Sequence, residues 1–104
     1  GSCAGLWEFP GGKVEPGEED ASALEREFAE RLDARIGVGE LITHVRHAYE
    51  AYSVDLFLYR CRIDAGSLRP AGVAEFRWVT SGEFDSFEFT PADEASMSAL
   101  LGER

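Results

Sequence analysis

The densest group of chemically reactive side chains in the sequence is a run of carboxylates between Glu15 and Glu30. This stretch holds six glutamates and Asp20. Glu27 and Glu30 are three residues apart, which on a helix places them about 60° apart around the axis. Two carboxylates at this spacing can share a hard cation such as Mg²⁺, and Glu18 in the preceding loop could approach the same helix end. The alternative is a solvated acidic face, and the spacing alone favours that alternative.

The element that must position these carboxylates is a helix. Apolar residues recur at intervals of three and four along one face, which predicts a helix from Glu19 to about Arg35. Asp20 or Ser22 could cap its start. The stripe consists of Ala21, Leu24, Phe28 and Leu32. Before the helix, two Pro-Gly turns, at residues 10–12 and 16–17, predict a tight loop.

The rest of the chain is predicted to form strands and a second helix. Residues 41–49 alternate between polar and apolar, which predicts a strand. Residues 53–63 are apolar on both faces, as in a central strand covered on two sides. A further short strand is expected at residues 76–79, and Pro91 introduces a helix to about residue 101. This order predicts an α/β or α+β sandwich.

Composition limits the partners of the chain. Its 104 residues are 44% hydrophobic and carry a formal net charge of −10, which is typical of one small acidic domain. Such a charge disfavours duplex nucleic acid and anionic membranes, unless a metal or a few cations neutralise it locally. Cys3 and Cys61 form no catalytic motif and suggest reduced thiols in a cytoplasmic protein. Because Met97 is the only methionine, we expect the domain to be N-terminally incomplete.

The string from Leu6 to Ala34, LWEFPGGKVEPGEEDASALEREFAERLDA, resembles the Nudix box. That pattern is G-x5-E-x7-R-E-U-x-E-E-x-G-U, where U is an apolar residue. The matching residues are Gly12, Glu18, Arg26, Glu27, Phe28 and Glu30. VRHAY, RWV and FTPAD, farther along, look like the corresponding segments of nucleoside-triphosphate pyrophosphohydrolases of the 8-oxo-dGTP and CTP type. The resemblance therefore spans nearly the whole chain.

The resemblance implies a fold and a reaction. The fold would be a single Nudix domain over residues 1–104, an α/β/α sandwich with a mixed sheet between two helices, here lacking an N-terminal strand. The reaction would be attack of water on the phosphate chain of a nucleoside triphosphate or a diphosphate-linked substrate. Mg²⁺, or Mn²⁺, would assist it by neutralising the phosphates and orienting the water. A nucleoside triphosphate would be hydrolysed to monophosphate and pyrophosphate. The oligomeric state is left open.

The resemblance also assigns roles to particular residues. The carbonyl of Gly11 and the carboxylates of Glu27 and Glu30 would bind the metal or act on the attacking water. Arg26 would hold Glu27 or Glu18 by hydrogen bonds and so support the catalytic group. Glu18 completes that group.

Three residues are candidates for substrate binding. Lys13 could contact phosphate or be an ordinary solvated loop lysine. Asp93 falls where relatives place a polar residue against the base; its carboxylate could accept from an exocyclic amino group, as on cytosine, or cap a helix. Phe89, with Phe84 and Phe87, could stack on a base or pack in the core. His44 and His47 are more typical of structural or surface groups.

Three positions depart from the pattern: Arg31 replaces the second glutamate of the E-E pair, Asp33 replaces the glycine that ends the box, and Gly72 replaces a glutamate found in many relatives. Asp tolerates a left-handed helix stop better than most residues. Arg31 lies four residues after Glu27, so an ion pair could occupy the carboxylate that the mechanism needs. Alternatively, Arg31 could touch phosphate directly.

The departures lead to a hypothesis and two rivals. The hypothesis is that metal-dependent hydrolysis is reduced relative to an intact box. One rival is a non-catalytic Nudix-fold module that binds a nucleotide or a protein. The other is a lesion-recognition domain like that fused to adenine glycosylases, which the net charge and the well-kept WEFPGGK loop disfavour.

Overall fold

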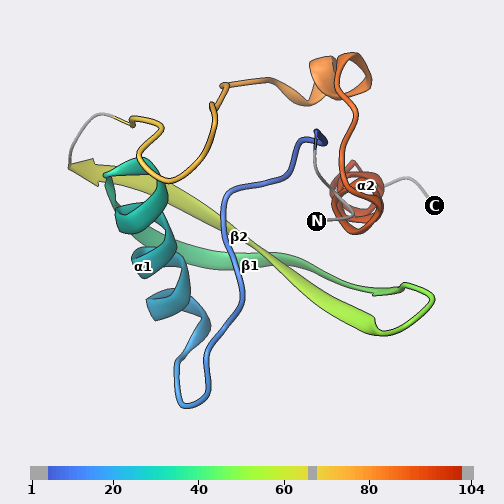
Figure 1. Ribbon diagram of the computed structural model, residues 1–104, viewed down its shortest axis with the longest axis horizontal. Helices are drawn as coiled ribbons and strands as arrows, with labels where there is room; N and C mark the ends of the chain where they lie inside the picture. The colour runs from blue at the N-terminus through green and yellow to red at the C-terminus, as the bar shows by residue number, and fades with distance from the viewer. Residues whose placement is uncertain (1–4, 66–67, 102–104) are drawn as a thin grey trace. The chain divides into compact units, whose positions relative to one another are not determined.

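The computed structural model describes residues 5–65 and 68–101 (Figure 1). Its elements, in chain order, are α1 (Asp20–Leu32), β1 (Arg35–Ala48), β2 (Ser53–Ala65), the 3-10 helix η1 (Ser81–Ser86) and α2 (Pro91–Leu100). β1 and β2 pair in a two-stranded sheet, as a long hairpin (Figure 1). The chain is therefore of the expected α/β class, with two helices and two strands among the predicted elements. β1 begins at Arg35 and not at residue 41, because α1 ends earlier than predicted.

Two compact units can be distinguished along the chain. Unit 1 comprises the described residues of 5–9, 41–59 and 79–101, and unit 2 those of 10–40 and 60–78. Each unit is described by itself below. No helix among the described residues is long and apolar enough to cross a membrane.

In unit 2, α1 is amphipathic, and its apolar face packs in a small hydrophobic core. Phe28, Leu32 and Ile36 are buried together. The partly buried side chains that pack on them are Leu24, Val38, Leu68, Val73 and Phe76. The N-cap residue is Glu19, without a side-chain cap bond. The expected caps were therefore wrong: Asp20 is already the first helical residue.

The C-terminal end of α1 is closed by its own backbone and by a distant segment. Asp33 adopts the left-handed conformation (φ 54°, ψ 41°), so the helix ends at Leu32 rather than near Arg35. The carbonyl of Leu32 accepts from the Arg69 backbone N–H at 2.9 Å. The carbonyl of Arg31 accepts from two more N–H groups of this segment, those of Ala71 and Gly72. Carbonyls that have no partner within a helix are thus satisfied by tertiary bonds.

In unit 1, α2 begins at a well-formed cap. The Thr90 side chain accepts from the Asp93 N–H, and Pro91 occupies the first turn, where a missing N–H costs little. Thr90, and not Asp93, is therefore the N-cap. The segment before α2 is tied to the start of the described chain through a parallel bridge between Trp7 and Phe89.

Two strand predictions need correction. Residues 76–79 form no regular element, and the Trp78 side chain is 72% exposed. β2 was expected to be central and covered on both faces, yet Phe57 is 43% exposed. In the described part of the chain β2 pairs with β1 alone, so it has an unpaired edge and exposed positions alternate with half-buried ones.

The left-handed stop at Asp33 can be tested by substitution. Asp33→Val should lower the free energy of unfolding by about 1–2 kcal/mol, because a β-branched residue resists positive φ. Asp33→Gly should stay within about 1 kcal/mol of wild type, since relief of the backbone offsets loss of an exposed ion pair with Arg69. Urea denaturation measures both. Equal effects of the two variants would contradict a left-handed stop at this residue.

Candidate active site

The glycine-rich loop at residues 10–13 runs along α1 in unit 2. Gly11 has φ +150°, a conformation that side-chain-bearing residues rarely adopt, and a Cβ there would meet Leu24 Cδ2 at 3.5 Å. A Cβ on Gly12 would lie 2.5 and 2.7 Å from the two carboxylate oxygens of Glu27. Only glycine therefore allows the backbone to approach this carboxylate so closely.

Arg26 is the centre of the charged cluster. Its Nε and Nη2 bind the two oxygens of Glu18 at 2.8 and 3.0 Å, a bidentate pair. Its Nη1 donates to Glu27 Oε2 at 3.0 Å, and Nη2 also donates to the Lys13 carbonyl at 3.1 Å. Glu30 Oε1 lies 3.5 Å from Nη1. The Arg26 guanidinium thus connects the loop to α1 and contacts three of the predicted site carboxylates, those of Glu18, Glu27 and Glu30.

Glu18 is fixed both by this arginine and by its own loop. The Glu15 N–H donates to Glu18 Oε1 at 2.9 Å, and the Glu18 N–H donates to the Glu15 carbonyl at 3.0 Å. The hydrogen bonds from Arg26, followed by the bond from Glu15, lower the pKa of Glu18 from 4.5 to about 2. The hydrogen bond to Glu18, and after it the bond to Glu27, raise the pKa of Arg26. Glu18 is therefore held as an anion, in a positioning role.

Glu27 is the buried carboxylate of the cluster, 7% exposed. Arg26 binds its Oε2, and Arg31 Nε lies 2.5 Å from its Oε1. The pair with Arg31 lacks the alignment of a hydrogen bond, so Oε1 is buried with no hydrogen-bond partner. The ion pair foreseen from the four-residue spacing is thus present, and it lies on the predicted metal ligand.

The donor set can be compared with what a magnesium ion requires. Among the described residues, no three His, Cys, Asp or Glu side chains converge as a complete metal site. Mg²⁺, however, is usually held by one or two carboxylates together with substrate phosphates and water. Glu27, with its buried Oε1 lacking a hydrogen bond, and the exposed Glu30 supply hard oxygen donors of that kind. The residues present therefore fit a divalent cation that is completed by a phosphate ligand.

Gly72, one of the three departures from the Nudix pattern, lies against α1 beside this cluster. A Cβ on Gly72 would lie 3.1 Å from the Glu30 carbonyl and 3.2 Å from Arg31 Cα. These are backbone atoms of a helix, so they cannot yield easily. No periodicity or spacing links the two segments, and only their tertiary contact makes this relation visible.

Asp93 and Phe89 belong to unit 1 and have surroundings of their own. Asp93 is 6% exposed, and its Oδ2 accepts from the Thr90 hydroxyl at 2.6 Å. Burial raises the pKa of Asp93, against the opposing effect of the Thr90 bond. Phe89 packs edge-on against Phe9 and Phe84, with ring centroids 5.8 and 5.9 Å apart. Phe89 is thus part of an aromatic cluster, which supports the packing alternative for this ring.

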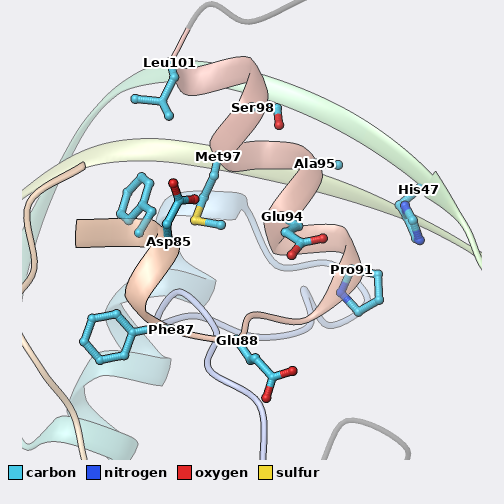
Figure 2. A pocket seen from close by; sticks show the side chains of 11 residues that line it. His47, Asp85, Phe87, Glu88, Pro91, Glu94, Ala95, Met97, Ser98 and Leu101 are labelled. Atoms are coloured by element: carbon cyan, nitrogen blue, oxygen red, sulfur yellow. The ribbon is translucent and has the colours of Figure 1, made fainter. Parts of the chain in front are cut away.

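A shallow groove of about 660 Å³ lies on the side of α2 and η1 in unit 1 (Figure 2). Phe87 and Met97 supply apolar lining, and Asp85, Glu88 and Glu94 add carboxylates. Neither Asp93 nor Phe89 is among the residues that line it. This groove is therefore separate from the residues predicted to meet a base.

The two histidines and Cys61 form no site of their own. His44 stacks on Phe57 and shares the carboxylate of Asp55 with Arg46, an exposed network on the hairpin. His47 packs edge-on against Tyr49. Burial raises the pKa of the Cys61 thiol, which is the opposite of activation. Cys3 lies outside the described residues.

The fold and the site define an α/β protein with a glycine-rich loop that lies against the helix α1. Arg26 connects the loop to this helix, which carries the buried carboxylate of Glu27. The chain belongs to the Nudix family: the family model of the NUDIX domain matches residues 1–99.

Similar proteins have related enzymatic names. The chain is 32% identical over 101 residues to the CTP pyrophosphohydrolase of Escherichia coli, covering 97% of this chain and 75% of that protein. It is 31% identical over 96 residues to the 8-oxo-dGTP diphosphatase of Haemophilus influenzae, covering 92% and 71%. The solution structure of the E. coli ORF135 protein superposes with a TM-score of 0.80 at 30% identity, covering 94% of this chain and 70% of that one. The structural neighbour shows the Nudix fold for this chain.

The Glu18–Arg26 pair should leave a signature in the pH dependence of stability. Because folding lowers the pKa of Glu18 from 4.5 to about 2, its stabilisation is complete above about pH 5 and is lost as the pH falls towards 2. Glu18→Gln should flatten this part of the decline in the free energy of unfolding, measured by urea denaturation at several acidic pH values. Glu25→Gln, the same charge change on an exposed side of α1, should keep the wild-type slope. Identical slopes for all three proteins would refute the role of Glu18.

Proposed function

We propose that the chain is a divalent-metal-dependent pyrophosphohydrolase that converts a nucleoside triphosphate to monophosphate and pyrophosphate. The observation that carries the proposal is the carboxylate of Glu27: buried beneath Gly12, fixed through one oxygen by Arg26, and left without a hydrogen bond at the other. Burial of a carboxylate requires compensation by cations, and because Arg31 Nε already lies close to this oxygen, a bound metal ion would share the oxygen with that guanidinium. The family membership and the names of the relatives support the same reaction class.

The proposed roles follow from the contacts in unit 2. Glu27, Glu30 and the Gly11 carbonyl would hold Mg²⁺ or Mn²⁺, which when bound neutralises phosphate charge and activates water. Arg26 keeps Glu27 in place, and Glu18 keeps Arg26 in place. Lys13 has no acid within ion-pair distance among the described residues, so its ammonium is available to a phosphate.

The proposed substrate carries an exocyclic amino group on its base. The Asp93 carboxylate would accept from that group, and both cytosine and guanine present such a donor. Phe89 would contribute an apolar surface beside it. The names of the relatives, CTP and 8-oxo-dGTP enzymes, agree with an amino-bearing base. For the fold we propose a single Nudix domain whose mixed sheet lies between two helices and lacks an N-terminal strand, and the TM-score of 0.80 supports the Nudix arrangement.

A second candidate function is a non-catalytic nucleotide-binding module of the same fold. Arg31 favours it, because its guanidinium lies against the carboxylate that the hydrolytic mechanism requires. Removing or reversing that charge therefore separates the two functions.

The direct test is turnover of a panel of nucleoside triphosphates. CTP, dCTP, 8-oxo-dGTP and UTP are incubated with Mg²⁺ and the release of monophosphate and pyrophosphate is measured. We expect hydrolysis of the amino-bearing nucleotides, weaker hydrolysis of UTP, and loss of activity in Glu27→Gln. Glu25→Gln is the matched control on the same helix and should behave as wild type. No turnover of any nucleotide would overturn the hydrolase and leave the binding module.

The influence of Arg31 is tested by Arg31→Glu. Replacing the guanidinium by a carboxylate adds a hard ligand beside Glu27, so Mn²⁺ affinity and Mg²⁺-dependent turnover should each rise by about 10-fold. Electron paramagnetic resonance of free Mn²⁺ measures affinity without relying on catalysis. If wild type and Arg31→Glu hydrolyse at the same high rate, Arg31 does not restrain the site.

A further inference from the structure

The two departures from the Nudix pattern that replace a glutamate, Arg31 and Gly72, contact each other. The Gly72 N–H donates to the Arg31 carbonyl at 2.9 Å. A Cβ on Gly72 would lie 3.2 Å from Arg31 Cα and 3.6 Å from Arg31 Cγ. A side chain at position 72 would therefore crowd the backbone of α1 at Glu30 and Arg31, and would be in ordinary van der Waals contact with Arg31 Cγ. The two departures are thus neighbours and form one local arrangement.

The guanidinium of Arg31 is anchored along one edge only. Its Nε lies against the buried Oε1 of Glu27. Within residues 5–65 and 68–101, no hydrogen bond involves its Nη1 or Nη2, and its ion pair with Glu27 is closest through Nε. The side chain is 47% exposed, so solvent and ligands can reach it. An arginine fixed by a buried carboxylate and open at its terminal nitrogens is pre-organised to bind an anion with two parallel hydrogen bonds.

The other arginine of the cluster cannot play this part. The nitrogens of Arg26 are engaged by Glu18, Glu27 and the Lys13 carbonyl. In the part of the chain that the structure describes, Arg31 and Lys13 are thus cations of unit 2 whose terminal nitrogens donate no hydrogen bond. Both charges belong to the chain itself and need no added ion.

We propose that Arg31 is a phosphate-binding residue, and that this site binds a di- or triphosphate chain in the absence of divalent metal. The proposal rests on the proposed function in that the phosphate chain is that of a nucleotide. The guanidinium holds Glu27 through Nε and the phosphate oxygens through Nη1 and Nη2. Arg31 thereby places a positive charge beside the phosphate. With a glutamate at position 31, a metal ion would have to provide that charge.

The test is calorimetric titration of CTP, and separately of inorganic triphosphate, in EDTA. Wild type should bind both ligands. Arg31→Gln should bind each about 10-fold more weakly or worse, the loss expected for a charge-assisted bidentate contact. The double variant Glu27→Gln, Arg31→Gln removes the buried charge together with its partner, so it guards against a variant that merely unfolds. Arg60→Gln, an exposed arginine of unit 2 paired with Glu40, is the control and should bind as wild type.

Each outcome separates this inference from the hydrolase itself. Absence of wild-type binding in EDTA, or binding of CTP but not of inorganic triphosphate, overturns the inference. Equal binding by wild type and by folded Arg31 variants overturns it as well. Turnover with Mg²⁺ but no binding in EDTA would leave the hydrolase standing and remove the inference. Arg31-dependent binding in EDTA without turnover would support the inference and remove the hydrolase.

Discussion

The bidentate bond from Arg26 to Glu18 is the interaction on which the candidate site depends. It joins a loop rich in glycine and proline, which has no regular structure of its own, to the well-packed helix α1. The same guanidinium reaches Glu27, so the position of the loop and the position of the buried carboxylate are set together. Gly12 makes this possible, since any side chain there would collide with the Glu27 carboxylate.

Burial of Glu27 then governs the electrostatics of the site. A buried carboxylate is strongly unfavourable without compensation, and compensation can come from an arginine, a metal ion or both. In this chain Arg26 binds one oxygen and Arg31 approaches the other. A glutamate at position 31 would add a second negative charge at the same place. The exchange of glutamate for arginine therefore reverses the charge that the site presents to a ligand beside Glu27.

Unit 1 contains a buried carboxyl group, Asp93, at the start of α2, and a cluster of phenylalanine rings. Phe9, Phe84 and Phe89 pack edge-on, while Thr90 caps α2 and hydrogen-bonds Asp93 at the start of that helix. Burial raises the pKa of Asp93, which makes this carboxyl less costly to keep out of water. Local capping and aromatic packing thus fix the residue that we assign to the base.

The sequence alone determined α1, the β1–β2 hairpin, α2 and the register of the Nudix box, because these depend on periodicity and on residues close together in the chain. The Arg31–Glu27 ion pair was foreseeable for the same reason, as a four-residue step on a helix. Only the tertiary structure decided that residues 76–79 are not a strand and that Gly72 lies against Arg31. Both outcomes depend on contacts between segments that are far apart in the sequence, and a local pattern of side chains does not predict such contacts.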